Sequence, residues 1–249
     1  MFKGFYNLTS GMVSQERRLD VVANNMTNIS TAGYRAELYT DSTFREVMIS
    51  RVGNKNKAVS TEMGMESYIL APSVLYTDYG QGAFDETELP LDFAIEGDGF
   101  FAIQTADGTA YTRAGSFILD NDGYLCMSEF GRVLDDQGEP LRLGTDQIHA
   151  DTAGNIYASD NSYLGTLGVY SFPDNDALER TPFGLFTGEG AQVNREMVIH
   201  HQWTERSNVS MIREMVSMMT TQRALQSAAT MSKIYDQVIV RATSDLGRL

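Results

Sequence analysis

The chain has 249 residues, of which 42% are hydrophobic, and it carries 33 Asp and Glu against 19 Lys and Arg, for a net charge of −14. This length accommodates one large domain or two modest ones, each with a proper hydrophobic core, while the acidity excludes a basic stripe that could neutralise nucleic-acid phosphates. The single cysteine, Cys126, excludes an internal disulfide framework, and no stretch approaches the ~20 apolar residues that a membrane span needs.

The charge is unevenly distributed along the chain. Residues 1–36 hold four basic and two acidic side chains, and residues 205–249 hold six basic and four acidic ones. The segment between them holds nine basic and 27 acidic side chains. Nearly neutral ends suit helices that pack closely against copies of themselves, and an acidic middle favours solubility. An acidic host proteome explains the composition equally well. The first 20 residues lack a continuous apolar run and a small-residue cleavage site, so no secretory signal peptide is expected.

The N-terminal segment, residues 1–36, predicts an amphipathic helix over residues 5–29 followed by an Asn-rich cap. Apolar side chains recur at 3,4 spacing, with the polar Gln15 as an interruption, at Phe5, Leu8, Met12, Leu19, Val22, Met26 and Ile29. A 3.5-residue apolar period is typical of a helix that packs along another helix. Gly33 is expected to cap the C-terminal end of this helix.

Residues 37–79 give mixed signals and are interpreted as a connecting segment. Phe44, Val47, Met48 and Ile49 suggest a short helix, whereas residues 53–57 (Gly-Asn-Lys-Asn-Lys) are typical of an exposed loop.

Residues 80–204 predict a central β domain. Strand-like residues 93–95 and 100–103 flank a turn at residues 96–99, which is rich in residues that tolerate positive φ. Further turn signals follow at residues 107–108, 121–123, 137–138 and 154–155. Such frequent turns indicate an antiparallel sandwich or barrel-like domain.

Residues 205–249 return to a helical pattern, with Ser207 or Asn208 as the candidate N-cap. A 3,4-spaced line of apolar and small side chains comprises Met218, Thr221, Leu225, Ala228, Ser232, Tyr235, Ile239, Ala242, Leu246 and Leu249. A second apolar line beside it comprises Ala224, Met231, Ile234 and Val238. This wide apolar arc favours more than one helical neighbour, although packing of two helices against the β domain fits the periodicity about as well. The expected fold class is α+β, in which the N- and C-terminal helices pair as a coiled-coil-like layer beside a central antiparallel all-β domain.

Methionine is used heavily near the C-terminal end, at Met211, Met215, Met218, Met219 and Met231. Flexible thioether side chains fill irregular contacts, which suits a helix with several slightly different neighbours. An apolar helix that stays unburied cannot offset its ordering entropy of ~1–2 kcal/mol per residue. Both ends can therefore be disordered before assembly.

The sequence contains no convincing metal loop. Asp120, Asp122 and Gly123 faintly resemble the opening of a calcium loop, but Tyr124 stands where a third ligand is needed and no glutamate closes the loop. A hairpin turn is the expected structure there.

No arrangement of side chains predicts catalysis or a bound cofactor. The adjacent His200 and His201 point to opposite faces of a strand and make a poor joint metal site. Glu96 and Asp98 could be imagined as an acid and base pair, but such neighbours are expected in so acidic a chain. Cys126 lies in an apolar strand pattern and is expected to be a buried thiol. The sequence therefore predicts a protein that is not an enzyme and has no cofactor and no metal.

Four segments resemble motifs of the bacterial flagellar rod and hook proteins. Residues 23–35 (Ala-Asn-Asn-Met-Thr-Asn-Ile-Ser-Thr-Ala-Gly-Tyr-Arg) are similar to that family's N-terminal signature, residues 91–101 to its Gly-Phe-Phe strand pair, and residues 111–117 (Tyr-Thr-Arg-Ala-Gly-Ser-Phe) to its Tyr-Thr-Arg-Asn-Gly-Ser-Phe strand. The C-terminal motif is matched in register by Glu205, Ser207, Asn208, Val209, Glu214, Met215, Met218, Gln222, Arg223 and Ala224.

The sequence departs from these motifs at a few positions. Met26 and Thr27 replace Leu-Ala, Ala32 replaces proline, Leu225 replaces a common tyrosine, and Arg206 lies inside the C-terminal motif. A length near 250 residues is similar to the rod proteins rather than the longer hook protein. The resemblance leaves the proximal and distal rod types open, with the short segment at residues 51–78 and the Leu-Gly-Arg-Leu ending favouring the proximal type.

The resemblance implies a structural subunit of the flagellar basal-body rod, the drive shaft that transmits torque. In this family the terminal helices pair into an inner tube of helically arrayed subunits, and the β domain lies outside it. The resemblance also implies export from the cytoplasm through the flagellar type III channel without a cleaved signal peptide, and a final location in the periplasm-spanning rod. The implied partners are copies of the chain and other rod and hook axial proteins, with the export apparatus and chaperone-like factors as further candidates. Neither nucleic acid nor membrane insertion is expected.

The predicted assembly interface lies on the two terminal helices. It comprises Phe5, Leu8, Met12, Leu19, Val22, Asn24, Asn25, Met26, Asn28, Ile29, Val209, Ile212, Met215, Met218, Leu225, Tyr235, Ile239 and Leu246. The three asparagines are interpreted as polar contacts between subunits or, equally well, as helix-end hydrogen bonds within one chain. The alternative function is a stand-alone β-domain binding module that its terminal helices merely dimerise. Hydrolysis of peptidoglycan lacks a plausible acid or metal site.

Overall fold

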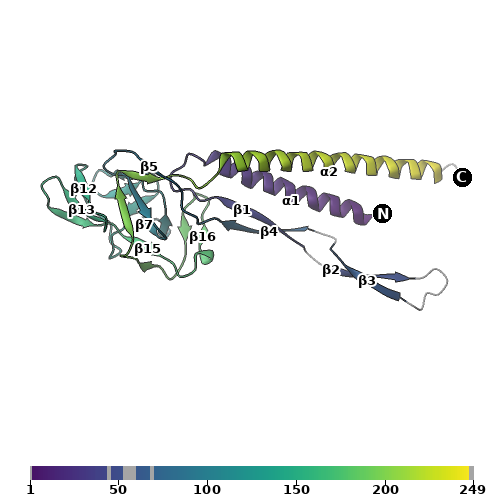
Figure 1. Cartoon of the computed structure of the whole chain (residues 1–249), viewed down its shortest axis with the longest axis horizontal. Coiled ribbons are helices and arrows are strands. Elements are labelled where there is room, and N and C mark those ends of the chain that lie inside the picture. Colours follow the sequence, from purple (N-terminus) through teal and green to yellow (C-terminus); the bar gives the residue numbers. More distant parts are fainter. Residues whose placement is uncertain (1, 44–45, 53–59, 68–69, 247–249) are drawn as a thin grey trace. The chain divides into compact units, whose positions relative to one another are not determined.

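The computed structural model describes residues 2–43, 46–52, 60–67 and 70–246. The chain forms two compact units (Figure 1). The terminal unit comprises residues 1–26, 37–76 and 211–249, and the β unit comprises residues 27–36 and 77–210. Among the described residues, no helix combines the length and the apolar character that crossing a bilayer requires.

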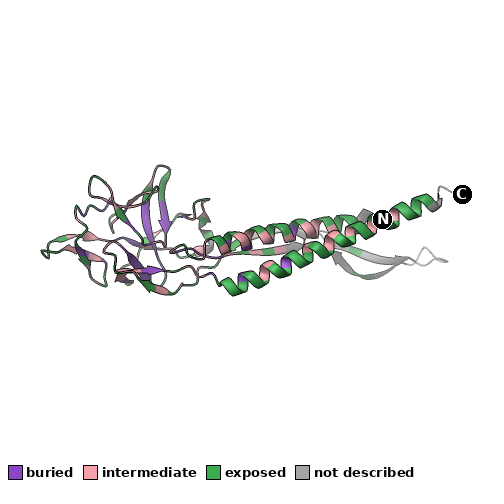
Figure 2. Ribbon diagram, turned by 90° about the horizontal axis from the view of Figure 1, so that it is seen from above, coloured by how far each residue is buried: buried purple, intermediate pink, exposed green. Residues whose placement is uncertain are grey.

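Two long helices belong to the terminal unit, α1 (Phe2–Thr27) and α2 (Met211–Leu246). They lie side by side in both ribbon views (Figures 1 and 2). A Cβ added to Gly4 of α1 would lie 3.5 Å from the hydroxyl oxygen of Tyr235 on α2. Most described members of the predicted 3,4-spaced line are among the less exposed side chains of α2, namely Met218, Thr221, Leu225, Ala228, Ser232, Tyr235 and Ile239, whereas Ala242 is exposed. The second apolar line, Ala224, Met231, Ile234 and Val238, is exposed.

The strands of the terminal unit replace the helix that the sequence suggested around residues 44–49. They are β1 (Glu37–Thr43), which pairs with β4 (Leu70–Thr77), and β2 (Glu46–Val52), which pairs antiparallel with β3 (Ser60–Ser67). Val47, Met48 and Ile49 lie in β2, so the predicted short helix is wrong. A short apolar run is compatible with either a helix or a strand, and here the pairing with β3 stabilises the strand. Phe44 and the predicted loop at residues 53–57 lie outside the described residues.

The β unit is built from short antiparallel strands, which confirms the predicted antiparallel character of the central domain. Its elements are β5 (Phe84–Glu86), β6 (Phe93–Glu96), β7 (Phe100–Thr105), β8 (Gly108–Thr112), β9 (Ile118–Leu119), β10 (Leu125–Met127), β11 (Gly131–Val133), β12 (Ile148–Ala150), β13 (Asn155–Ala158), β14 (Tyr163–Thr166), β15 (Val169–Ser171), the 3-10 helix η1 (Asn175–Ala177), β16 (Glu179–Arg180), β17 (Phe186–Thr187), β18 (Gln192–Val193), β19 (Val198–His201) and β20 (Trp203–Glu205).

The largest described sheet has the strand order β16-β17-β8-β7-β11-β10-β9, and β15 pairs with both β7 and β18 at its side. A three-stranded sheet, β12-β13-β14, and the pairs β19-β6 and β20-β5 complete the unit. Strands β6 and β7 flank the predicted turn at residues 96–99 but do not pair with each other, because β6 pairs with β19 far along the chain. The turn therefore carries the chain from one sheet to another. The predicted hairpin turn near Gly123 is confirmed, since β9 pairs with β10.

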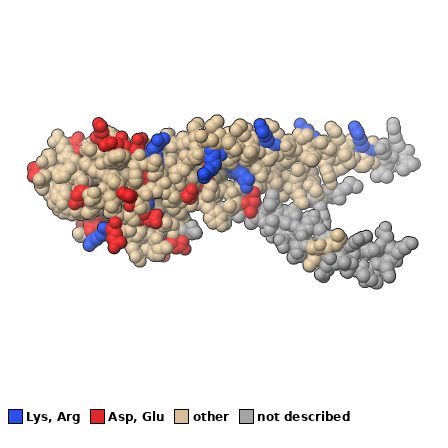
Figure 3. Space-filling model, in the orientation of Figure 1, with Lys and Arg blue, Asp and Glu red and all other residues tan. Residues whose placement is uncertain are grey.

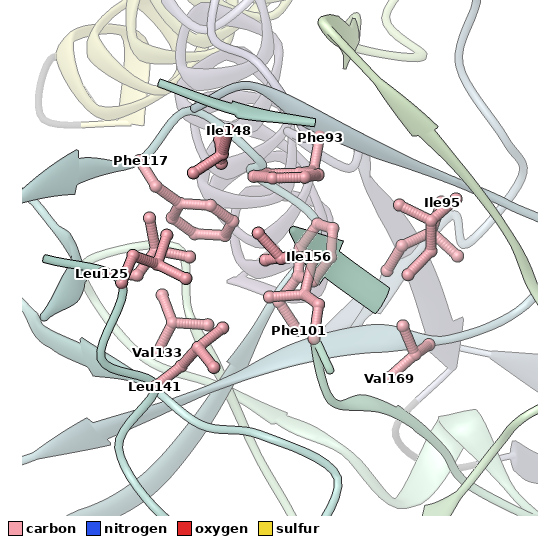
Figure 4. Close-up of a cluster of buried hydrophobic side chains, with 13 residues drawn as sticks. Phe93, Ile95, Phe101, Phe117, Leu125, Val133, Leu141, Ile148, Ile156 and Val169 are labelled. Atoms are coloured by element: carbon pink, nitrogen blue, oxygen red, sulfur yellow. The ribbon is translucent and has the colours of Figure 1, made fainter. Parts of the chain in front are cut away.

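The hydrophobic core of the β unit lies between these sheets (Figure 4). It consists of Phe93, Ile95, Phe101, Phe117, Leu125, Val133, Leu141, Leu143, Ile148, Ile156, Leu167, Val169 and Ile199, all of them buried. Residues near the end of the unit, such as Ile199 in β19, complete a core that begins at Phe93 in β6. The ends of the β unit are thus held together by the core as well as by strand pairing.

Candidate assembly interface and buried junction

The terminal unit buries little apolar surface. Among its described side chains, Val22 is the only buried hydrophobic residue, and the other buried side chains are the polar Ser14, Asn25, Glu214 and Thr221. Of the predicted interface residues, Leu8, Met12, Leu19, Met26, Met218, Leu225, Tyr235 and Ile239 are half-buried. A helical layer packed in this way has only a small hydrophobic core of its own.

Polar contacts connect α1 to β1 and α2 inside the terminal unit. The Asn25 side chain accepts a hydrogen bond from the Glu37 backbone N–H (2.9 Å) and donates one to the Glu37 carbonyl (2.8 Å). It also hydrogen-bonds the carboxyl group of Glu214, whose pKa is raised because the group is buried. Arg18 of α1 pairs with Asp41 of β1 at 3.0 Å. These contacts fix Asn25 and hold the start of α2 beside the end of α1.

The other two predicted asparagines also have contacts within the chain. Asn24 donates a hydrogen bond to the Glu37 carboxylate (3.3 Å). Asn28 lies just beyond α1, in the β unit, where its side-chain oxygen accepts a hydrogen bond from the Thr31 hydroxyl at 3.2 Å and its carbonyl accepts one from the Thr31 backbone N–H. Asn28 therefore stabilises the turn that follows the helix.

The start of α2 carries an exposed apolar patch on the side away from its buried residues. The patch consists of Met211 (52% exposed), Ile212 (78%), Met215 (46%), Val216 (51%) and Met219 (49%). At about 100° per residue, Ile212, Met215, Val216 and Met219 lie at least about 100° around the helix from the buried Glu214, whereas Met211 lies about 60° from it, at the edge of the patch. Two predicted interface residues, Ile212 and Met215, thus lie in solvent in the single chain.

The remaining predicted interface residues are dispersed. Phe5 is exposed on α1, beside the exposed Tyr6 and Val13. Ile29 and Val209 belong to the β unit, where both pack with Tyr34 and Ala36. The side chain of Leu246, the last residue of α2, lies outside the described part. The structure therefore does not bring all of the predicted residues onto one surface of one unit.

A buried ionic junction lies in the β unit, and no residue of it was predicted as a site. The carboxylate of Glu205 accepts hydrogen bonds from Arg35 (2.6 Å), from Arg113 (3.2 Å) and from the backbone N–H of Gly82 (2.7 Å). The side chains of Glu205, Arg35 and Arg113 are 0%, 1% and 3% exposed. Two guanidinium groups therefore share one carboxylate away from water. Burial, together with the neighbouring Arg35, lowers the pKa of Arg113 to about 10, while Glu205 opposes this shift.

Backbone carbonyls complete the surroundings of the two arginines. Arg35 donates to the Gly80 carbonyl at 3.0 Å, and Arg113 donates to the carbonyls of Ile95 and Gly97. These acceptors compensate part of the surplus positive charge. The junction thereby connects residues near both ends of the β unit with the turn that follows β6.

Gly33 and Asn208 serve this junction rather than capping helices. Gly33 has φ +68°, but α1 ends at Thr27, and a Cβ on Gly33 would lie 2.2 Å from the Ala114 nitrogen. Its N–H donates to the Glu205 carbonyl at 2.7 Å. Asn208 accepts from the Ala36 N–H and donates to the carbonyls of Asp78 and Gly80, whereas α2 begins only at Met211. The two predicted cap assignments are therefore wrong, because both residues fill close contacts between distant segments.

The sites considered for metal binding have other partners. Asp120 accepts hydrogen bonds from the backbone N–H groups of Asp122 and Tyr124 and pairs with Arg132. The Tyr124 N–H is the main cause of the lowered pKa of Asp120. Cys126 is half-buried rather than buried, and burial raises its pKa. No cluster of metal-ligating side chains occurs among the described residues.

The two adjacent histidines diverge. The ring of His200 hydrogen-bonds the Glu96 carboxylate at 2.8 Å, and the ring of His201 hydrogen-bonds the Pro90 carbonyl at 2.8 Å. The opposite orientations follow from the alternation of side chains along β19.

Charge differs between the two units in the way the sequence predicts. The visible face of the β unit shows many Asp and Glu side chains, whereas α2 shows mainly Lys and Arg (Figure 3). Between Glu214 and Asp236, α2 contains Arg223 and Lys233 as its only charged residues. This stretch of α2 therefore carries no negative charge. Negative charge there would oppose packing against copies of an acidic chain.

Three family models match the chain. They are "Flagella basal body rod protein" over residues 5–35, "Flagellar hook protein FlgE/F/G D1 domain" over residues 94–164, and "Flagellar basal body rod FlgEFG protein C-terminal" over residues 201–244. The first match contains the Asn-rich motif, the second contains Arg113, and the third contains Glu205 and Asn208. The matched motifs thus supply the three side chains of the buried ionic junction.

Whole-length relatives give the same result. The chain is 29% identical to the flagellar basal-body rod protein FlgG of Bacillus subtilis, over 96% of this chain and 97% of that protein. It is 31% identical to the flagellar basal-body rod protein FlgF of Mesorhizobium japonicum, over 94% and 93%, and 32% identical to FlgG of Agrobacterium fabrum, over 87% and 89%. Relatives of both names thus match at similar identity. The chain belongs to the flagellar basal-body rod protein family, and it is a structural protein of the flagellum rather than an enzyme.

Proposed function

We propose that this chain is a subunit of the flagellar rod that polymerises helically through its terminal helices and transmits torque. The observation that carries the proposal is the composition of the terminal unit, in which Val22 is the only buried hydrophobic residue among the described side chains. Long helices with so small a core have to bury apolar surface elsewhere to be stable. The patch on α2 from Met211 to Met219 supplies such a surface.

A second copy of the chain is the occupant that we assign to this patch. The outer side of α1 carries Phe5, Tyr6 and Val13, which are also exposed, and Tyr6 and Val13 are one heptad apart. A contact between α2 of one copy and α1 of another joins two different surfaces. Such a heterologous contact does not close on itself unless the rotation forms a ring, and otherwise it generates an open helical array.

The expected strength of one such contact favours an array over a dimer. Burying five half-exposed side chains contributes on the order of 1 kcal/mol each, whereas association costs at least about 4 kcal/mol in lost freedom. A single contact is therefore weak, and each subunit needs several neighbours to be held firmly. A helical array provides this repetition, and α2, with 36 residues and hence a length of ~54 Å, is long enough to meet more than one neighbour.

We further propose that the chain reaches the rod by flagellar type III export without a cleaved signal peptide, and that other axial proteins contact it at both ends of its array. One cysteine excludes an internal disulfide that would oppose unfolding before passage through a channel. Some predicted interface residues, such as Leu225 and Tyr235, are half-buried within one chain. In this proposal they pack α1 against α2 of the same chain rather than against a neighbouring copy.

The test is a double substitution in the patch, Ile212→Asp with Val216→Asp, in the full-length chain. Both side chains are exposed, so the folded subunit should keep its circular dichroism spectrum while polymer formation, followed by light scattering and electron microscopy, is abolished. The matched control is Thr109→Asp with Ser128→Asp, which adds the same charge at two exposed positions of the β unit and should still polymerise. Normal polymerisation of the patch variant would contradict the proposal. A compact soluble dimer as the only assembly of the unchanged chain would favour the binding module instead.

A further inference from the structure

Three methionines lie in the exposed patch at the start of α2. Met211, Met215 and Met219 are spaced four residues apart, so their thioethers follow one side of the helix. Each is about half exposed in the single chain (52%, 46% and 49%). The other members of the patch, Ile212 and Val216, are inert to mild oxidants, and the thioethers are therefore its only oxidisable groups.

We propose that Met211, Met215 and Met219 form an oxidation site whose sulfoxides prevent a second copy of the chain from docking on α2. This inference rests on the proposed polymerisation through the terminal helices. The oxidant is a peroxide. Its O–O bond breaks, one oxygen atom is transferred to the thioether sulfur, which is oxidised by two electrons, and the other oxygen leaves as water when the peroxide is hydrogen peroxide.

The effect on docking follows from the chemistry of the product. A sulfoxide carries a strong polar S=O group on a side chain that was apolar, and burying such a group without a hydrogen-bond donor is unfavourable. The patch offers no donor side chain, since its other members are Ile212 and Val216, and the helical N–H groups from Met215 onward are used within α2. Three sulfoxides in one small contact should therefore raise the concentration needed for polymerisation about tenfold or more.

The chain contains methionines that serve as internal controls. Met12, Met26, Met127 and Met197 are half-buried, so peroxide should oxidise them more slowly than the three patch residues. Met48 in β2 and Met63 in β3 are 48% and 67% exposed but lie outside the patch. They should be oxidised as readily, without any consequence for docking through α2.

The experiment treats the full-length soluble subunit with hydrogen peroxide, maps sulfoxides by peptide mass spectrometry and then measures polymerisation. Oxidised protein should need at least about a tenfold higher concentration to polymerise while keeping its helical circular dichroism signal. Methionine sulfoxide reductases of both stereospecificities should restore polymerisation at the original concentration. The variant with Met211→Leu, Met215→Leu and Met219→Leu keeps an apolar patch and should polymerise after the same treatment. The control variant with Met48→Leu and Met63→Leu should remain sensitive.

Three results would overturn the inference. The first is oxidation of the patch methionines no faster than that of Met127 and Met197, the second is a triple leucine variant as sensitive as the unchanged chain, and the third is normal polymerisation of the fully oxidised unchanged protein. Failure of the proposed function has a different signature, because the variant with Ile212→Asp and Val216→Asp would then polymerise normally without any oxidant. Loss of polymerisation in that variant, together with normal polymerisation of fully oxidised unchanged protein, contradicts only the role of the methionines.

Discussion

The terminal unit and the β unit bury different kinds of side chain. In the terminal unit the described buried side chains are Val22 and four polar residues, whereas the β unit encloses a cluster of 13 hydrophobic residues (Figure 4). The β unit is therefore stabilised within one chain by the ordinary hydrophobic effect. The terminal unit is held by hydrogen bonds such as those of Asn25 and leaves apolar surface exposed. One chain thus combines a unit that has a hydrophobic core of its own with a unit that leaves most of its apolar side chains exposed or half-buried.

Amide hydrogen exchange of the soluble subunit would sharpen this comparison most. Amides of β6 and β7 should exchange only through global unfolding, which costs at least about 5 kcal/mol, whereas amides of α1 and α2 should open locally at little cost. The two sets of protection factors should differ by at least about 10³. Equal protection in both units would mean that the terminal helices are stable in the single chain. That result would favour the dimeric binding module over the polymerising subunit.

Removal of the buried carboxylate should have the largest effect of any single substitution. Glu205→Gln leaves Arg35 and Arg113 buried together without a counter-charge, which should destabilise the β unit by about 3–5 kcal/mol. Trp203, the only tryptophan, lies in β20 two residues away and reports unfolding in urea through its fluorescence. The control Glu96→Gln removes an exposed carboxylate that hydrogen-bonds His200 and should cost under about 1 kcal/mol. Equal losses in the two variants would contradict a dominant role for the junction.

A matched pair of leucines compares the packing of the two units directly. Leu125→Ala creates a cavity in the core of the β unit and should cost about 2–5 kcal/mol in the free energy of unfolding. Leu225→Ala removes a half-buried side chain of α2, which contributes at most about half as much, and leaves space that solvent can enter. Denaturant titrations of both variants give the two values. A larger loss for Leu225→Ala would show that the helices have a substantial core of their own.

The smallest expected effect is a pH dependence of the terminal unit. Burial raises the pKa of Glu214 above its ordinary value of 4.5, so the folded state holds this proton more tightly than the unfolded chain does. The stability of the unit is then unaffected below the ordinary pKa of glutamic acid and falls as the pH rises through the raised pKa. Glu214→Gln should remove this fall, and thermal melts followed at the helical circular dichroism band from about pH 4 to 7 measure it. The exposed Glu16→Gln should melt like the unchanged chain, and parallel curves for Glu214→Gln would contradict the expectation.

The sequence predicts the features that depend on local periodicity. The 3,4 spacing correctly identified both helices and the less exposed line through Leu225 and Tyr235, and the turn signals correctly indicated an antiparallel β domain. Strand β2 was missed although its partner β3 follows it directly along the chain, because a short apolar run fits a helix as well as a strand. Other missed features depend on segments far apart in the chain, as in the pairing of β6 with β19.

The buried junction was missed for the same reason. Arg35 and Glu205 each resemble ordinary surface charges in so acidic a chain, and only the fold brings them together. One signal was present, because Arg35, Arg113 and Glu205 all lie in the segments that resemble family motifs. Where the sequence shows no arrangement for catalysis, a charged residue within such a motif favours a structural ion pair. Gly33 and Asn208 were misassigned for a similar reason. A glycine or asparagine near a helix end fits a cap from local propensity alone, and only the contacts with distant segments show its actual role.

The position of this junction has a mechanical consequence. Residues 27–36 leave α1 and residues 206–210 lead into α2, and both segments are fastened by Arg35, Glu205 and Asn208. A force that draws residues 27 and 210 apart is borne first by these bonds, and it reaches the strands that hold Phe101 and Leu125 only after they break. The junction is therefore expected to take up such a force before the strands of the hydrophobic core do.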